Sequence, residues 1–128
     1  MFGFQMIGPV ICGFRSNTTE ELCSRWFQLA ALYPLAYSHN DNETILQEPY
    51  ALGPVVLNAA KTGLKLRYSL LKYFYTLFVK NRGLGTLWRP LFFEYPIDDN
   101  TYIDNIADTQ FFIGSDLLAA PVVEEGVK

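Results

Sequence analysis

The chain has few of the residues that bind metals or nucleic acids. Its 128 residues include one histidine and two cysteines, whereas a structural zinc site needs four ligands. Its 10 lysines and arginines are outnumbered by 13 aspartates and glutamates, which gives a formal net charge of -3. Nucleic-acid-binding domains usually carry a clear basic excess instead. We therefore expect neither a metal site nor a nucleic-acid partner.

The sequence also has no long apolar run. Its longest apolar-rich stretch, residues 26–37, is about half of the ~20 residues that a membrane-spanning helix needs. Residues 1–10 have no basic segment, and glycine and proline interrupt their apolar residues, so we expect no secretory signal there. Because 50% of the residues are apolar and 16% are aromatic, the composition predicts a folded core.

The first part of the chain has the pattern of a strand followed by a helix. Residues 4–11 are mostly apolar and predict a buried strand that ends in a turn at Gly13. A capping box of Thr18 and Glu21 is expected to start the helix, and Pro34 to stop it. The predicted apolar stripe of this helix consists of Leu22, Trp26, Leu29 and Tyr33.

A second strand and a long helix are expected next. Residues 35–37 are apolar and lead into the polar loop 38–42. The periodicity of residues 54–81 predicts a helix that Gly83 helps to end. Its cations, among them Arg67, are expected on a solvated face. The predicted apolar face consists of Leu57, Ala60, Leu64, Leu71, Tyr75 and Phe78.

The composition changes after Gly85. Residues 87–95 are rich in aromatic and apolar side chains, and residues 96–100 have the composition of a turn. Residues 111–113 and 117–123 are predicted to be further strands. The order of elements therefore predicts an α/β first half and an all-β second half.

Ordered blocks along nearly the whole chain are similar to one enzyme family. They resemble the late-barrel signature of the family 31 glycoside hydrolases. The matching blocks are residues 8–14, 17–23, 25–26, 28–29, 33–34, 39–40, 47–50, 66–68, 75–77, 89–94, 114–115, 117–118 and 121–122.

This resemblance implies a fragment of a larger enzyme. Residues 1–90 would be the C-terminal part of a (β/α)8 TIM barrel, and residues 91–128 the first strands of a β-sandwich. Two strand–helix units make only about a quarter of a barrel, which needs about 250 residues. The resemblance also implies retaining hydrolysis of α-linked glucosides by two aspartates about 5 Å apart, a reaction that needs no cofactor. Both catalytic aspartates are expected upstream of Met1, in the remainder of the parent polypeptide.

Two residues are candidates for contacts to an α-glucoside or oligosaccharide substrate. Phe14 matches an aromatic residue that packs against the bound glucose in the family, and His39 matches a histidine that hydrogen-bonds its hydroxyls. Both follow the carboxyl ends of predicted strands, where barrel active sites lie. Without the resemblance, Phe14 would be interpreted as a core residue and His39 as an ordinary surface histidine.

Two positions depart from the family's pattern. Many members carry an aspartate where this chain has Val10, and often an arginine where it has Tyr37. Valine cannot accept a hydrogen bond, so a sugar hydroxyl placed there would go unpaired at a cost of about 1–3 kcal/mol. The departures suggest altered specificity or a decayed site.

The cysteines and sequons indicate the compartment. The resemblance implies a disulfide between Cys12 and Cys23; the alternative is two buried free thiols, as in many cytosolic proteins. Asn17 and Asn42 begin N-glycosylation sequons, and the first coincides with a sequon position of the family. Together these features favour the secretory pathway, as lysosome, endoplasmic reticulum or extracellular space, for the parent enzyme.

Three functional hypotheses remain open at the level of sequence. The first is a fragment of an α-glucosidase-type enzyme that supplies part of the glucose pocket. The second is a non-catalytic carbohydrate-binding or chaperone-like remnant, which Val10 and Tyr37 favour. The third is an unfolded product of a truncated gene.

Overall fold

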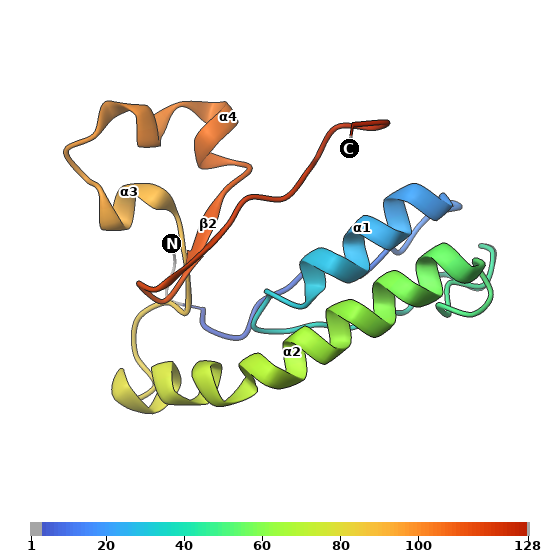
Figure 1. The fold of residues 1–128 in the computed structure, drawn as a ribbon, viewed down its shortest axis with the longest axis horizontal. Coiled ribbons are helices and arrows are strands. Elements are labelled where there is room, and N and C mark those ends of the chain that lie inside the picture. The colour runs from blue at the N-terminus through green and yellow to red at the C-terminus, as the bar shows by residue number, and fades with distance from the viewer. Residues whose placement is uncertain (1–3, 128) are drawn as a thin grey trace. The chain divides into compact units, whose positions relative to one another are not determined.

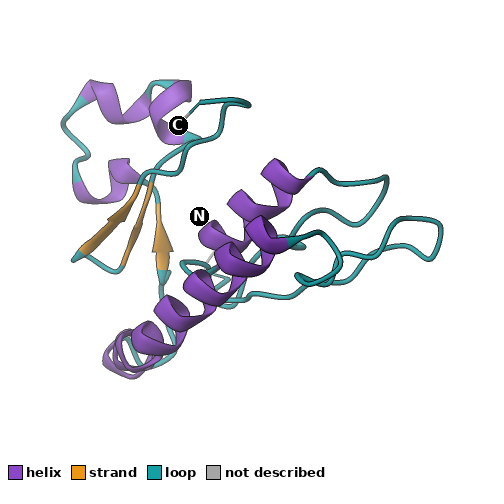
Figure 2. Cartoon of the chain, turned by 45° about the vertical axis from the view of Figure 1, so that its right-hand side comes forward, coloured by secondary structure: helices purple, strands orange, loops and turns teal. Residues whose placement is uncertain are grey.

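A computed structural model describes residues 4–127 of the chain. The described residues divide into two compact units, residues 6–72 and residues 73–127 with residues 4–5. The elements shown in Figures 1 and 2 are α1 Glu20–Ala30, α2 Pro54–Lys80, β1 Trp88–Arg89, α3 Leu91–Glu94, the 3-10 helix η1 Asp99–Tyr102, α4 Asp104–Ala107, β2 Phe111–Ile113 and β3 Leu117–Ala119.

The expected strand at residues 4–11 is reduced to a single bridge. Val10 and Tyr37 form an isolated parallel β-bridge, flanked by a hydrogen bond from the Leu35 N–H to the Ile7 carbonyl oxygen at 3.0 Å. The approach is close, since a Cβ on Gly8 would lie 1.8 Å from the Leu35 oxygen. Parallel strands are normally stabilised by neighbours in a larger sheet. The described residues add no further strand to this pair, so no extended ladder forms.

Helix α1 begins one residue later than the predicted capping box requires. Thr19 has an extended backbone, and its hydroxyl accepts a hydrogen bond from the Leu22 N–H at 3.2 Å. The prediction of a Thr18–Glu21 box is therefore wrong, because Thr18 is buried and lies before the cap. Glu21 instead pairs with Arg25 one turn later, at 2.5 Å.

The buried face of α1 is also displaced from the predicted stripe. Leu22 is 47% exposed, whereas Cys23 and Phe27 are buried. The bond from Cys23 to Cys12 turns this neighbouring face towards the core of the unit. That core consists of Ile11, Cys12, Cys23, Phe27, Ala30, Val56 and Ala60, with Trp26, Ala36 and Leu52 packed against it.

Helix α2 has nearly the predicted extent but buries only part of the predicted face. Ala60 of that face is buried, together with Val56 and Phe74 from outside it, whereas four other members are exposed: Leu64, Leu71, Tyr75 and Phe78. Close packing on α1 selects the buried face. A Cβ on Gly63 would lie only 2.4 Å from the carbonyl oxygen of Phe27, so glycine lets the two helices touch (Figure 1).

The ends of both helices differ from the predicted stops. Helix α1 ends at Ala30, four residues before Pro34. Helix α2 ends in a Schellman-type turn, in which the Gly83 N–H binds the Phe78 carbonyl oxygen at 3.0 Å. Arg82 is the first residue there with a left-handed backbone, at φ 53°, so Gly83 does not act alone.

The second unit contains a three-stranded antiparallel sheet in the order β1-β2-β3 (Figure 2). In its register, Trp88 faces Ile113 and Phe112 faces Leu118. The hydroxyl of Tyr73, in α2, donates to the Ile113 carbonyl oxygen at 2.8 Å.

The predicted all-β character of this half is wrong in part. Helix α3, η1 and α4 lie between β1 and β2, and β3 is shorter than residues 117–123. The predicted turn at residues 96–100 runs into η1, because the Asp98 side chain accepts from the Asn100 N–H at 3.0 Å and caps that helix.

Candidate functional site

The two sugar-site candidates meet at the ends of the paired extended segments. The rings of Phe14 and His39 have centroids 5.1 Å apart and an interplanar angle of 56°. A backbone hydrogen bond from the Asp41 N–H to the Phe14 carbonyl oxygen, 3.0 Å long, joins the two loops. Phe14 and His39, which are 25 positions apart in sequence, are thus brought into direct ring contact.

A third ring extends this contact. Tyr37 stacks on His39 with centroids 5.7 Å apart and planes at 25°. In the sequence, Tyr37 is noted only because it stands where the family often has an arginine. Its contact with His39 could have been predicted from their spacing, because residues i and i+2 of an extended segment share a face.

The three rings form an exposed surface, which we call the aromatic cluster of Phe14, Tyr37 and His39. Phe14 is 40% exposed and Tyr37 is 38% exposed, and His39 is exposed as well. Phe14 is therefore not a core residue of this structure. Ring faces can pack against the C–H groups of a sugar, and the imidazole can hydrogen-bond its hydroxyls.

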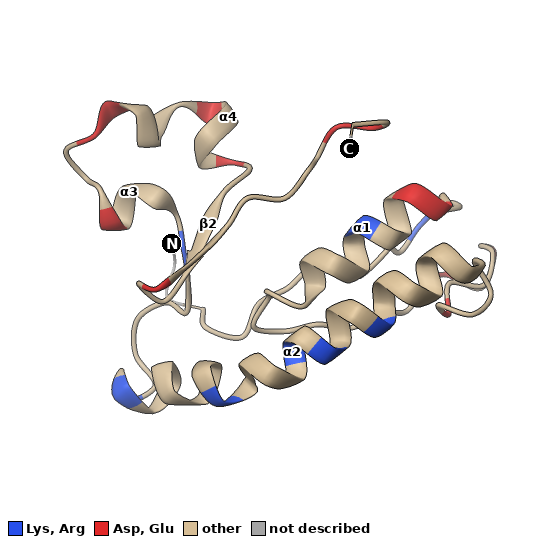
Figure 3. Ribbon diagram, viewed as in Figure 1, with Lys and Arg blue, Asp and Glu red and all other residues tan. Residues whose placement is uncertain are grey.

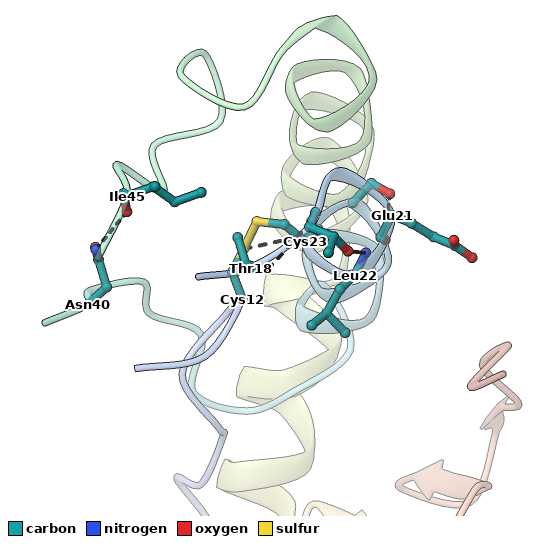
Figure 4. Close-up of a disulfide and its surroundings, with 9 residues drawn as sticks. Cys12, Thr18, Glu21, Leu22, Cys23, Asn40 and Ile45 are labelled. Carbon is teal, nitrogen blue, oxygen red and sulfur yellow. Dashed lines mark hydrogen bonds between the residues drawn. A yellow bond between two sulfur atoms is a disulfide. The ribbon is translucent and has the colours of Figure 1, made fainter. Parts of the chain in front are cut away.

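A disulfide holds the loop that carries Phe14. Cys12 and Cys23 are bonded, with Cα atoms 4.5 Å apart, and the bond ties the end of the first extended segment to α1 (Figure 4). The predicted pairing is confirmed, and neither cysteine is a free thiol. The turn is tight, since Cys12 has φ 68° and Gly13 has φ 96°.

Asparagine side chains organise the loop that follows His39. Asn40 donates through Nδ2 to the Ile45 carbonyl oxygen at 3.0 Å (Figure 4). The same Nδ2 atom donates to the Thr44 hydroxyl at 2.5 Å. The Oδ1 atom of Asn17 accepts from the Ile45 N–H at 3.0 Å, which joins the first sequon to the residue that follows the second. Asn17 and Asn42 are both exposed.

Arg67 of α2 supports the second extended segment from behind. Its guanidinium donates to the carbonyl oxygens of Ala30, Tyr33 and Pro34, at 3.3 Å for Ala30 and 2.8 Å for Pro34. Burial lowers the pKa of Arg67. The expectation of a solvated cation is wrong for this residue, whereas the lysines of α2 are exposed. Figure 3 shows the lysines and arginines of this helix together in blue.

A cavity of about 440 Å³ lies beside Arg67. Side chains of both long helices line it, including Phe27, Leu64 and Leu71. Tyr37 also lines it, whereas Phe14 and His39 do not. The aromatic cluster therefore borders this cavity through Tyr37. Among residues 4–127, no three His, Cys, Asp or Glu side chains are grouped to hold a metal ion.

Comparison with known proteins identifies the family. The family model for the glycosyl hydrolases family 31 TIM-barrel domain matches residues 1–77, and that for the family 31 C-terminal domain matches residues 85–128. The chain belongs to glycoside hydrolase family 31. The predicted fold class is thereby confirmed: a C-terminal piece of the TIM barrel is followed by the start of the next domain.

Individual relatives agree with the family 31 assignment. The lysosomal acid alpha-glucosidase of Tetrahymena pyriformis is 50% identical over 125 residues, which are 96% of this chain but 13% of that protein. A glucose-bound family 31 dextranase of Flavobacterium johnsoniae has a TM-score of 0.80 and 31% identity, over 92% of this chain and 15% of that one. ER glucosidase II has a TM-score of 0.80 and 34% identity, over 94% of this chain and 13% of that one.

The family 31 chain is thus one part of a much larger fold in its relatives. It spans 13% of the Tetrahymena pyriformis enzyme and 15% of the dextranase chain. Family 31 enzymes are glycosidases, and the relatives named here include α-glucosidases. In the described part of the chain, no helix is both long and apolar enough to cross a membrane.

Proposed function

We propose that the full-length protein containing this chain is a retaining α-glucosidase-type glycosidase, and that this segment supplies part of its glucose pocket. The observation that carries the proposal is the contact between Phe14 and His39, with ring centroids 5.1 Å apart, in a family 31 barrel segment. Both residues follow extended segments at their carboxyl ends, where barrel enzymes place their active sites.

In this proposal the chain binds substrate and does not supply the reacting carboxylates. Phe14 offers a ring face to the C–H groups of the glucose unit, and His39 hydrogen-bonds its hydroxyls. The nucleophile and the acid/base are two aspartates about 5 Å apart, contributed by the rest of the polypeptide. The substrate is an α-glucoside or oligosaccharide, and carboxylate chemistry of this kind requires no cofactor.

We also place the full-length protein in the secretory pathway. The disulfide between Cys12 and Cys23 is of the kind that persists in oxidising compartments. The exposed Asn17 and Asn42 are the proposed glycosylation sites. The hydrogen bond from the Ile45 N–H is accepted by the Oδ1 atom of Asn17, so it does not use the Nδ2 atom that would carry the glycan. One relative is named as lysosomal and another as an ER enzyme.

We propose that the barrel segment comprises residues 1–90 and that the β-domain begins with residues 91–128. Strand β1, at Trp88–Arg89, lies on the barrel side of this division but pairs with β2. The ion pair between Arg89 and Glu94, at 2.7 Å, joins the two sides of the proposed division.

The decisive experiment is substitution of His39 in the full-length protein. We expect His39→Ala to lower kcat/KM for 4-nitrophenyl α-D-glucoside by about 10- to 100-fold, because one hydrogen bond to the sugar is lost. Tyr50→Ala is the matched control, since Tyr50 is 72% exposed and outside the aromatic cluster. Unchanged kcat/KM in a folded His39→Ala variant would contradict the role of His39.

A non-catalytic carbohydrate-binding role is the second candidate, and Val10 and Tyr37 favour it. It predicts binding of maltose without hydrolysis, and no pair of catalytic aspartates encoded upstream of Met1.

The third candidate is an unfolded product of a truncated gene. A cooperative thermal transition of the isolated chain would argue against that hypothesis.

A further inference from the structure

The two departures from the family's sequence pattern lie opposite each other in the structure. Val10 and Tyr37 are the two partners of the parallel bridge, and the Ile11 N–H donates to the Tyr37 carbonyl oxygen at 3.0 Å. Residues that are 27 positions apart in sequence are therefore direct neighbours. Val10 is half-buried at this contact.

Direct pairing means that the two side chains must suit each other. Opposite charges on paired positions support one another, whereas a single charge beside an apolar partner is left without compensation. Uncharged residues at both positions avoid the cost of a charge that has no partner. We therefore interpret Val10 and Tyr37 as one coupled, uncharged pair, and not as two independent losses of the charged residues that family members carry there.

Tyr37 also contributes directly to the surface on which a sugar would bind. Its ring lies at 25° to that of His39, and His39 in turn contacts Phe14. Exposed fractions of 38% for Tyr37 and 40% for Phe14 leave both rings accessible. Phe14 and Tyr37 thus share His39 as a neighbour, and the C–H face of a pyranose can pack on the exposed parts of these rings.

We propose that Tyr37 is a sugar-binding, specificity-determining residue, and that it acts as an uncharged pair with Val10. The ligand it favours is a neutral pyranose recognised by its C–H face. The inference rests on the proposed function, because it assigns Tyr37 to the same pocket as Phe14 and His39.

This mode of recognition has a consequence for specificity. A site built around hydrogen bonds to one hydroxyl rejects an analogue that lacks it, because the polar groups of the site are left unpaired. Packing against a ring discriminates far less between such analogues. A protein with the Val10–Tyr37 pair should therefore tolerate some monodeoxy glucosides.

The first test uses full-length protein and binding of glucose, measured by calorimetry, because an α-glucoside such as maltose would be hydrolysed during the titration. We expect Tyr37→Ala to weaken binding about tenfold, and Tyr37→Phe to recover most of that loss, because it retains the ring. The matched control is Tyr50→Ala, which removes an equally large side chain from an exposed position. Unchanged affinity in a folded Tyr37→Ala variant would overturn the proposal.

The second test measures the coupling of the pair. We expect Val10→Asp and Tyr37→Arg each to lower the unfolding midpoint, and the double variant to recover most of the loss. The double variant should also discriminate more strongly than the natural pair between 4-nitrophenyl α-D-glucoside and its monodeoxy analogues. Additive losses in the double variant would refute the coupling.

The outcomes separate this inference from the proposed function. If the natural protein binds glucose but does not hydrolyse any α-glucoside, hydrolysis fails as its function while the Tyr37 assignment is still tested by the affinity for glucose. If His39→Ala weakens binding but Tyr37→Ala does not, the glucose pocket stands and the Tyr37 inference is wrong. Loss of binding with both substitutions supports both.

Discussion

The guanidinium of Arg67 donates a hydrogen bond to the carbonyl oxygen of Pro34 at 2.8 Å. Pro34 directly precedes the extended segment that carries Tyr37 and, two residues further on, His39. The same guanidinium binds the Ala30 carbonyl oxygen at 3.3 Å, so α2 holds both the end of α1 and the start of this segment. Support for the aromatic cluster therefore comes from a residue far from it in sequence.

Removal of this support should destabilise the first unit. We expect Arg67→Leu to lower the free energy of unfolding by about 1–3 kcal/mol, because backbone carbonyl groups lose a charged donor. Arg67→Lys should retain only part of this stability, because an ammonium group lacks the planar fork of donors that a guanidinium has. Urea denaturation measures both effects. Lys65→Leu is the control, from an exposed cation of the same helix, and an equal loss there would argue against a specific role of Arg67.

The cap of α1 provides a second prediction. Thr19→Ala should cost about 1 kcal/mol of stability, because the Leu22 N–H loses its acceptor. Thr19→Ser keeps the hydroxyl and should remain near the natural stability. Thermal unfolding of unglycosylated protein compares the two, since Thr19 is also part of the Asn17 sequon. Equal midpoints for the alanine and serine variants would show that Thr19 is not the cap.

Reduction of the disulfide should loosen the loop that carries Phe14. In the chain-entropy model, a cross-link that closes so short a loop is worth roughly 3 kcal/mol. Unfolding in the presence and absence of a thiol reductant measures the loss. A Cys12→Ser/Cys23→Ser variant is the control, because the reductant should not change its stability. A reductant effect of the same size in that variant would point to another cause.

The raised pKa of Tyr73 predicts that the protein loses stability at alkaline pH. Burial, and then the hydrogen bond to Asp116, raise the pKa of Tyr73 above its usual value of 10.0. The folded state therefore holds the phenolic proton more tightly than the unfolded state does. The resulting stability is fully present below pH 10 and is lost as the pH rises through the folded-state pKa.

Unfolding experiments between pH 8 and pH 12 test this dependence. Tyr73→Phe cannot ionise at this position and should reduce the slope of stability against pH above pH 10. Tyr75→Phe is the matched control, because Tyr75 lies on the same helix and is 71% exposed. An unchanged slope in Tyr73→Phe, or an equal change in both variants, would contradict the assignment.

Local signals predicted some elements well. The long helix is confirmed at Pro54–Lys80, because its extended periodicity and its proline at the first position act over neighbouring residues. The N-cap of α1 was harder to predict from the sequence, because Thr18 and Thr19 are chemically alike. Which of them caps the helix depends on the backbone conformation, and Thr19 is the extended residue. The short helices between β1 and β2 were missed because four-residue segments carry too little periodicity to recognise.

The sequence by itself determined the family, the long helix, the pairing of Cys12 with Cys23 through that family, and the candidates Phe14 and His39. Tertiary structure decided which helix faces are buried, because close contact at Gly63 and the bond at Cys23 select them. It also decided that Tyr37 faces Val10 and stacks on His39. Side-chain periodicity specifies a face within one segment, whereas only the packing of distant segments specifies what that face meets.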